Sequence, residues 1–420
     1  MRILLFGFGS RGDVQPLIAL GKGLQRAGYA VSLAAGINFQ SLVEGEGLEF
    51  EPVHVDVEQY MKTEIGQAWL GESSHNPRLE MQNMKRMADG IAPLVTEDIM
   101  RVTEHADVLI SGLLTIEPLE AVARARGKRH IAGLLSPLAP TSSGAAGMQA
   151  LLPRQSSPIN RWWGYAIELM MFSVLRSPSE SVHARLGIPP ASRSEFLRAW
   201  NQTPALVGIS PLVTPKPPDW GDHIHVTGFW FLDAPADWQP SPALQAFLDA
   251  GAPPVYIGFG SMSSRNPQAT TQVMIEALNK TGQRGVIHSG WAGLHAEDLP
   301  PNIFLLDYAP HDWLFPRMAG VVHHGGAGTT AAGLRAGVPG MIVAHIGDQP
   351  YWGRRLHELG VGAAPLRRHE LTADKLADAI RAMTSDRAMQ SRAAALGERI
   401  RAEDGVGSAV RAVGRILGTA

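Results

Sequence analysis

Short apolar runs and amphipathic stretches alternate along the first third of the chain. The runs at residues 2–8, 29–35, 108–110 and 129–134 have the length and apolar character of buried strands, and residues 16–27 repeat apolar side chains at helical spacing. Strands that alternate with helices form parallel sheets with helices packed on them. The pattern therefore predicts an α/β domain.

The alternation stops between residues 208 and 240 and then restarts. Prolines crowd this segment, which has little periodicity and a strand-like fragment at 224–226, so its composition predicts a linker. The elements expected after it are an apolar strand within 254–261, a helix at about 268–281, strands at 284–288, 303–306, 321–322 and 341–344, and a helical pattern over 383–417. The second half thus repeats the α/β pattern of the first.

The length of the chain favours two domains. At 420 residues it exceeds what one hydrophobic core usually supports. We expect two doubly wound, Rossmann-like parallel-sheet domains, with an N-terminal domain over 1–212, a linker over 213–240 and a C-terminal domain over 241–420. Ligands bind such sheets at the carboxyl ends of the strands. The loops at those ends, facing one crevice, should therefore carry the functional residues.

Charge and composition exclude several classes of function. A net charge of −2 and the lack of a long basic run argue against a nucleic-acid role. The absence of cysteine excludes disulfides, thiolate nucleophiles and cysteine-ligated metals. The apolar start of the chain ends at Gly7, too early for an export signal, and no window approaches the roughly 20 apolar residues that span a bilayer. These features predict a soluble, cytoplasmic protein.

A glycine-rich turn at residues 324–330 is the most specific local feature. An apolar run at 320–322 leads into it and a helical pattern at 330–336 leaves it, so a strand delivers the turn to a helix N-terminus. The first amides of a helix lack internal partners and carry partial positive charge, and glycine lets an anion approach them closely. With the imidazole of His324 and the hydroxyl of Thr329, this turn predicts a phosphate-binding site. The preceding His323 should point to the other side of the strand and serve the structure.

A second glycine pattern, at Gly7, Gly9 and Gly12, matches the dinucleotide-binding fingerprint. That fingerprint needs an acidic residue about 20 positions later, at the end of the second strand, to hold the ribose. Here the second strand ends in Ala34, Ala35 and glycine. A nicotinamide or flavin enzyme is therefore disfavoured.

Four segments together resemble the GT-B fold family 1 glycosyltransferases, in particular the sterol glucosyltransferase and glycopeptide-antibiotic type. They are Gly-Ser-Arg-Gly-Asp-Val-Gln-Pro at 9–16, Gly-Phe-Gly-Ser-Met at 258–262, Tyr-Ala-Pro-His-Asp-Trp-Leu at 308–314, and the stretch from His324 to Gly353. The resemblance implies an inverting transferase that moves a sugar from a nucleoside diphosphate to a hydroxyl of a lipophilic acceptor, such as a sterol, a polyketide or a peptide antibiotic.

The resemblance also assigns donor-binding residues. Tyr308 is expected to stack on the base, and Asp348 and Gln349 to bind the sugar hydroxyls. Ala332 stands where many relatives have a ribose-binding glutamate, so uridine and thymidine diphosphate sugars both stay open. The residues assigned to the diphosphate are Ser10, Arg11, Ser261, His324, Gly326, Gly328 and Thr329.

Asp13 matches the general base of this type of enzyme. An inverting displacement needs a base for the acceptor hydroxyl on one face of the sugar while the diphosphate leaves from the other. The alternative is structural, because an aspartate ahead of a helix that opens at Pro16 is a common helix cap. Since helix-end charge and His324 can stabilise the leaving group, neither a catalytic metal nor another cofactor is expected.

Apolar residues of the first half suggest an acceptor pocket. Met81 and Met84 on one segment, and Trp162 and Trp163 on another, suit a bulky apolar ligand, although core packing explains them equally well. Two further functions keep the fold: a non-catalytic partner of a transferase, and an epimerase or phosphorolytic enzyme acting on nucleotide sugars. The presence of Asp13, His324, Asp348 and Gln349 disfavours the non-catalytic partner, and the Asp13 motif disfavours the epimerase or phosphorolytic enzyme.

Overall fold

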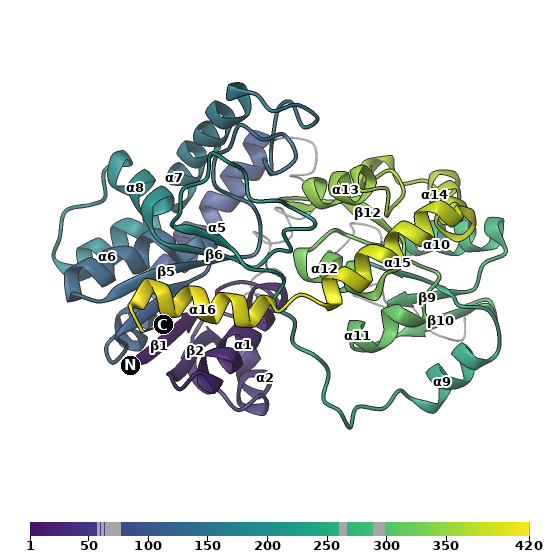
Figure 1. Ribbon diagram of the computed structural model, residues 1–420, viewed down its shortest axis with the longest axis horizontal. Helices are drawn as coiled ribbons and strands as arrows, with labels where there is room; N and C mark the ends of the chain where they lie inside the picture. Colours follow the sequence, from purple (N-terminus) through teal and green to yellow (C-terminus); the bar gives the residue numbers. More distant parts are fainter. Residues whose placement is uncertain (57–58, 60–62, 64–76, 260–266, 289–298, 420) are drawn as a thin grey trace. The chain divides into compact units, whose positions relative to one another are not determined.

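The chain forms two compact units in a computed structural model that describes residues 1–56, 59, 63, 77–259, 267–288 and 299–419 (Figure 1). Among these residues, unit 1 comprises those up to 232 together with 404–419, and unit 2 comprises 233–403. Each unit is an α/β domain built on one parallel sheet, which confirms the fold class expected from the sequence.

The sheet of unit 1 has the order β3-β2-β1-β4-β5-β6-β7. All its neighbouring strands pair in parallel. The order reverses between β1 and β4, which is the switch point of a doubly wound sheet and the place where such sheets bind ligands. The strands are β1 (Arg2–Phe6), β2 (Ala30–Gly36), β3 (Glu49–Val53), β4 (Val108–Ser111), β5 (Arg129–Leu134), β6 (Ala205–Val207) and β7 (Ile224–Val226).

Helices cover both faces of this sheet because alternate strand residues point to opposite sides. On β1, Ile3 and Leu5 pack in one core with helices α1 and α16, whereas Leu4 and Phe6 pack in the other with α5 and α6. The helices of unit 1 are α1 (Arg11–Arg26), α2 (Gln40–Gly45), α5 (Pro77–Val102), α6 (Ile116–Arg126), α7 (Pro158–Leu186), α8 (Arg193–Gln202) and α16 (Gly405–Leu417).

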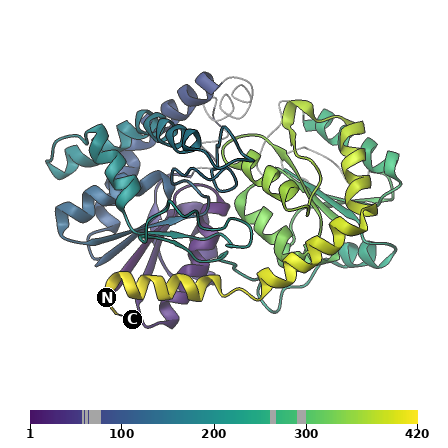
Figure 2. The same cartoon turned by 45° about the horizontal axis from the view of Figure 1, so that its top comes forward.

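The last helix of the chain, α16, belongs to unit 1. Figures 1 and 2 both show it beside α1, and Ala409, Val413 and Leu417 lie in the same core as α1. The expected C-terminal domain, 241–420, includes this helix, although the sequence leaves open whether the helix packs on that domain or on the first. Its packing on α1 depends on contacts between residues almost 400 positions apart, which a local pattern does not contain.

Unit 2 repeats the doubly wound order with six strands, β10-β9-β8-β11-β12-β13. Its switch point lies between β8 and β11. The strands are β8 (Val255–Gly258), β9 (Gly285–His288), β10 (Ile303–Leu306), β11 (Gly320–His323), β12 (Gly340–Ala344) and β13 (Leu366–Arg367). The helices are α9 (Pro242–Asp249), α10 (Pro267–Thr281), α11 (His311–Leu314), α12 (Ala327–Ala336), α13 (Gln349–Glu358), α14 (Ala373–Ser385) and α15 (Arg387–Arg401).

Three expected elements differ from the structure. The first helix begins at Arg11, and Pro16 lies inside it rather than at its start. The proline-rich segment contributes β7 to the sheet of unit 1, so the chain up to Leu232 packs with that unit. The helical pattern of 383–417 is interrupted where Asp386 and Asp404 each cap the N-terminus of a new helix.

Candidate functional site

The turn between β11 and α12 ends in a helix start that has no side-chain cap. The N-cap residue is Gly326, and the first turn of α12 contains no acidic residue. The hydroxyl of Thr330 donates back to the Gly326 carbonyl oxygen at 2.9 Å, whereas Gly328 and Thr329 lie at the helix start itself. Such an end offers amides and partial positive charge to an anion.

The two histidines at the end of β11 have different environments. His323 is buried, and its Nδ1 accepts a hydrogen bond from the Gly325 amide at 3.0 Å, which agrees with a structural role. Burial lowers the pKa of His324 to about 4, so its imidazole is neutral at pH 7. Among the described residues, its buried Nδ1 has no hydrogen-bond partner. A buried nitrogen in that state costs free energy, which a ligand that bonds to it would recover.

Close packing joins this turn to the start of α13. Gly325 has a φ of +96°, and a Cβ there would meet the Cγ2 of Ile342 at 2.7 Å and the Cβ of Gln349 at 3.0 Å. Only glycine fits this position, because other residues rarely adopt this backbone conformation and their Cβ would have no space. The glycine-rich turn after β11 and the pair Asp348 and Gln349 after β12 therefore lie next to each other, at the carboxyl ends of the two strands.

Asp348 and Gln349 both make internal hydrogen bonds. The Oε1 of Gln349 accepts from the amides of His345 and Ile346 at 2.7 and 3.1 Å, which fixes the loop before α13. The Oδ2 of Asp348 accepts from Nε1 of the buried Trp352 at 2.8 Å. The pair thus has a structural function that the sequence analysis did not foresee.

The remaining donor-side residues lie at the same edge of the unit 2 sheet or outside the described residues. Tyr308 follows β10 and its side chain is 52% exposed. Two strands, β9 and β8, separate β10 from β11, which corresponds to about 14 Å at the usual strand spacing. Ser261 lies outside the described residues; the ring of Phe259, just before it, packs 5.7 Å from that of His345.

The corresponding turn of unit 1 is closed by its own side chains. Ser10 is the N-cap of α1, and its hydroxyl accepts from the Gly12 amide at 3.2 Å. The Oδ2 of Asp13 accepts from the Ser10 amide at 2.7 Å and from the Ser10 hydroxyl at 3.0 Å, which completes a capping box. Gly9 is required beside it, since its φ is +143° and a Cβ there would lie 2.3 Å from that oxygen. The side chain of Arg11 donates to Gln15 at 3.0 Å.

Asp13 therefore serves as the third helical residue of a capping box rather than as the N-cap itself. The structural alternative offered for Asp13, a helix cap, is therefore correct. The expected start of the helix at Pro16 is wrong, because the helix begins at Arg11. A carboxylate that accepts two hydrogen bonds can still accept a proton from a ligand through its other oxygen. The geometry thus allows both a capping and a catalytic role.

The four expected acceptor residues lie in two different surroundings. Met81 and Met84 pack against a small cluster that includes Phe196 and Leu175. Trp162 and Trp163 are exposed on α7, at 75% and 38%.

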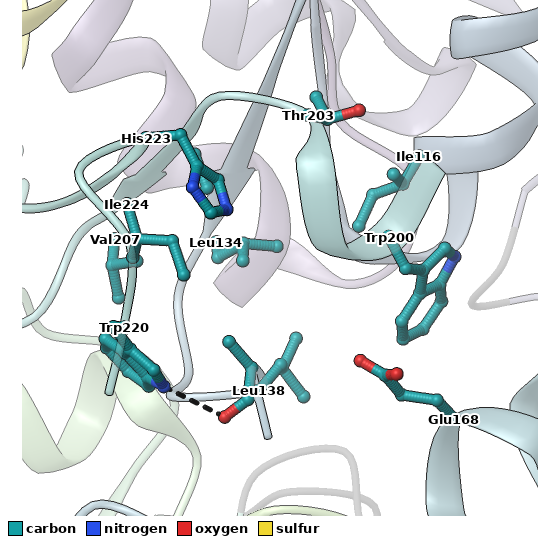
Figure 3. A pocket seen from close by; sticks show the side chains of 12 residues that line it. Ile116, Leu134, Leu138, Glu168, Trp200, Thr203, Val207, Trp220, His223 and Ile224 are labelled. Atoms are coloured by element: carbon teal, nitrogen blue, oxygen red, sulfur yellow. Dashed lines mark hydrogen bonds between the residues drawn. The ribbon is translucent and has the colours of Figure 1, made fainter. Parts of the chain in front are cut away.

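Unit 1 contains a small, mainly apolar pocket that the sequence analysis missed (Figure 3). Figure 3 shows the carboxyl group of Glu168 directed into it from α7. Burial raises the pKa of Glu168 to about 7, although Asn201 donates to its Oε2 at 2.8 Å. The other residues that line it are Ile116, Leu134, Leu138, Ala139, Trp200, Thr203, Ala205, Val207, Trp220, His223 and Ile224. A single glutamate in an apolar helix belongs to no sequence motif. The pocket could therefore be recognised only from the tertiary structure.

Within the ranges that the structure describes, no three histidine, aspartate or glutamate side chains are grouped so that they could hold a metal ion. None of the described helices is long and apolar enough to cross a membrane.

Both halves of the chain match known protein families. Residues 3–132 match the glycosyltransferase family 28 N-terminal domain, and residues 275–407 match the C-terminal domain of erythromycin biosynthesis protein CIII-like proteins. These two matches contain the β1–α1 turn with Asp13 and the β11–α12 turn with His324, respectively.

Characterised relatives match over almost the whole chain. Sterol 3-beta-glucosyltransferase UGT80A2 of Arabidopsis thaliana is 36% identical over 98% of this chain, which spans 65% of that enzyme. Sterol 3-beta-glucosyltransferase UGT80B1 of the same plant is 35% identical, with 99% and 68% covered. O-mycaminosyltylonolide 6-deoxyallosyltransferase of Streptomyces fradiae is 34% identical, with 97% of this chain and 96% of that enzyme covered.

Solved structures confirm the fold. The calicheamicin glycosyltransferase CalG4 superposes with a TM-score of 0.70 at 18% identity, over 100% of this chain and 98% of that chain. Glycosyltransferase VinC, solved with DTDP, superposes with a TM-score of 0.66 at 19% identity and covers both chains fully. Together with the relatives above, these matches establish that the chain belongs to the family of GT-B glycosyltransferases that includes the sterol glucosyltransferases and the antibiotic glycosyltransferases.

Proposed function

We propose that this glycosyltransferase moves a sugar from a uridine or thymidine diphosphate to a hydroxyl of a lipophilic acceptor such as a sterol or polyketide, with inversion at the anomeric carbon. The observation that carries the proposal is the uncapped start of α12, which offers backbone amides beside His324 at the switch point of unit 2. The acceptors named for two of the relatives, a sterol and O-mycaminosyltylonolide, support the acceptor class.

In the proposed donor site, the diphosphate binds at the start of α12. The amides of Gly326, Gly328 and Thr329, the Thr329 hydroxyl and a ring nitrogen of His324 are its contacts. Because His324 is neutral at pH 7, it acts as a hydrogen-bond partner rather than as a counter-ion. The positive charge then comes from the helix end.

In this proposal the base lies on one side of the diphosphate along the sheet edge, and the sugar lies on the other side. Tyr308 follows the outer strand β10, about 14 Å from β11 by strand spacing, and it is the proposed stacking partner of the base because its ring is exposed. Asp348 and Gln349, which adjoin the turn at Gly325, are the proposed contacts of the sugar hydroxyls. Ser261 is a further proposed phosphate contact, as the resemblance implies.

Asp13 is the proposed general base. The acceptor hydroxyl gives its proton to the carboxylate of Asp13, the hydroxyl oxygen attacks the anomeric carbon, and the bond from that carbon to the diphosphate oxygen breaks. The leaving diphosphate keeps the electron pair and is stabilised at the start of α12. Ser10 and Arg11, which the resemblance assigns to the diphosphate, bond within α1, and the proposed donor site does not include them.

We further propose that transfer needs no metal ion and takes place in the cytoplasm. The first point is supported by the helix end, which supplies the positive charge that a divalent cation supplies in other transferases. It is tested by assaying transfer in excess chelator. Activity should persist, and a loss that magnesium or manganese restores would contradict the leaving-group account.

The donor and the acceptor are tested with a matrix of substrates. Purified protein is incubated with UDP-glucose, TDP-glucose or GDP-glucose and with a sterol, a macrolide aglycone or a small hydrophilic alcohol, and products are followed by mass spectrometry and anomeric proton NMR. We expect a glycoside of a lipophilic acceptor from a uridine or thymidine donor, with inverted configuration. Transfer only to the hydrophilic alcohol, or retention of configuration, would contradict the proposal.

A further inference from the structure

Helix α7 is apolar on two opposite faces. Its inner face packs into unit 1, where Val174, Leu175 and Val182 are buried and Gly164 lies against Pro140. Figure 1 shows it alongside α5, with which it shares an extensive contact. Its outer face should then be polar, because a surface helix normally directs charged and polar residues toward water. The N-terminal half of α7 departs from this rule.

The outer face of this half carries large apolar side chains at helical spacing. The positions 159, 162, 163, 166, 169 and 170 share one face of a helix, because they recur at intervals of three and four residues. Trp162 is 75% exposed, and Leu151 and Leu152 in the preceding loop are exposed as well. We call this set the α7 patch: Leu151, Leu152, Ile159, Trp162, Trp163, Leu169 and Met170.

The charges around the α7 patch are mainly positive, although the carboxylate of Asp219 attracts Arg161. Arg154, Arg161 and Arg176 are exposed in this segment. The only acidic residue between positions 121 and 176 is Glu168, which is buried on the inner face. The next acidic residue, Glu180, pairs with Arg176. A chain with a net charge of −2 thus has a local excess of positive charge where its apolar side chains are exposed.

We propose that the α7 patch docks on the surface of an anionic lipid bilayer. Tryptophan prefers the boundary between headgroups and acyl chains, and a helix that combines such apolar residues with flanking arginines lies in the plane of that boundary. The arginines gain from the negative surface potential of acidic lipids. A second copy of the chain is a poorer occupant, because a two-fold contact would oppose the same arginines across the interface.

The location of the patch would bring the enzyme to acceptors that dissolve in membranes. This consequence rests on the proposed function, but the docking itself does not. Vesicle binding is therefore measured without donor or acceptor, so that a failure of docking and a failure of sugar transfer are separate results.

The experiment is co-sedimentation of the full chain with phosphatidylcholine vesicles and with vesicles that contain 30 mol% phosphatidylserine. Three variants are compared with the unaltered chain: Trp162→Ser with Trp163→Ser, Arg154→Glu with Arg161→Glu, and the control Leu94→Ser. Leu94 is 55% exposed on α5 and lies outside the patch. Melting temperatures of all variants exclude misfolding, and light scattering reports the oligomeric state.

We expect the chain to bind the phosphatidylserine vesicles and to bind phosphatidylcholine at least about tenfold more weakly. Each patch variant should lose about tenfold or more of the binding to acidic vesicles, and Leu94→Ser should lose none. Equal binding by all four proteins, or equal binding to both kinds of vesicle, would overturn the proposal. So would a dimer of the unaltered chain that the tryptophan variant dissociates, since the patch would then bind a second copy.

Discussion

The two units present a glycine-rich turn at the start of a helix, yet the two helix starts differ. The start of α1 is occupied by Ser10 and by the carboxylate of Asp13, which lies where an anion would bind. The start of α12 has Gly326 as its N-cap and no side-chain cap. One turn is thus already neutralised by its own acidic residue, whereas the other offers its amides to a ligand.

This difference explains why a glycine pattern alone does not identify a phosphate site. The pattern Gly7, Gly9 and Gly12 satisfies the dinucleotide fingerprint, but the amide of Gly12 bonds to Ser10 and a negative charge lies at the helix end. A phosphate there would meet like charge and fewer donors. The proposed nucleotide site is therefore at α12, and the carboxylate at α1 can serve another function.

Removing the charge of Asp13 should have the largest effect. In Asp13→Asn, the side-chain oxygen can still accept from the Ser10 amide, so the capping box persists and the melting temperature should change little. The variant cannot take the acceptor's proton, and transfer should fall at least about 100-fold. Initial rates of transfer and a thermal melt measure the two effects.

The control for this variant is its affinity for free UDP or TDP, which should be unchanged. Near-normal turnover in Asp13→Asn would leave Asp13 with the capping role alone. The next candidate for the base is then a histidine of the first domain, such as His130, whose Nδ1 lies 3.0 Å from Glu120 and whose Nε2 lies 2.8 Å from Ser111.

The sequence predicted the strands better than the helix boundaries. The ranges of β5 and β10 agree with the structure: β10 is an uninterrupted apolar run, and β5 is apolar after Arg129 and His130. The start of α1 was misplaced because Pro16 is a strong start signal, whereas the capping box of Ser10 and Asp13 begins the helix earlier. The local pattern also could not distinguish the packed Met81 from the exposed Trp162, since both lie on apolar helices.

At the uncapped end, replacing His324 should weaken donor binding. The His324→Ala variant loses a hydrogen bond to a charged group, worth about 2 to 3 kcal/mol, which corresponds to roughly a 30- to 150-fold rise in Kd for UDP or TDP. Calorimetric titration measures this directly. Unchanged affinity for both nucleotides would remove the imidazole from the diphosphate site.

A pair of glycines on α12 separates anion binding from helix stability. A Cβ added at Gly328 or at Gly333 would meet no atom within 4 Å, so alanine at either position should stabilise the helix by about 0.5 to 1 kcal/mol. Only Gly328 lies at the helix start. Gly328→Ala should therefore also raise the Kd for UDP by about tenfold, a loss of about 1.4 kcal/mol of contact.

Gly333→Ala is the matched control, because it makes the same chemical change one and a half turns further along the helix. Its nucleotide affinity should equal that of the unaltered enzyme. If both variants bound UDP normally, the diphosphate would not approach the start of α12, and the contrast between the two turns would lose its functional meaning.

The smallest expected effect concerns the cap of α1. Ser10→Ala removes the oxygen that accepts from the Gly12 amide and the hydroxyl that donates to Asp13, while the backbone bond from residue 10 to Asp13 remains. Loss of an N-cap costs about 1 kcal/mol of unfolding free energy. Since one of the two hydrogen bonds from Ser10 to Asp13 persists, transfer should fall only a few-fold, in kcat rather than KM.

Ser10→Thr keeps a hydroxyl and should restore both stability and turnover. The contrary outcome is a marked loss of UDP affinity in Ser10→Ala that threonine does not restore, although threonine restores the stability. That outcome would mean that Ser10 contacts the diphosphate and that the capped turn also takes part in donor binding.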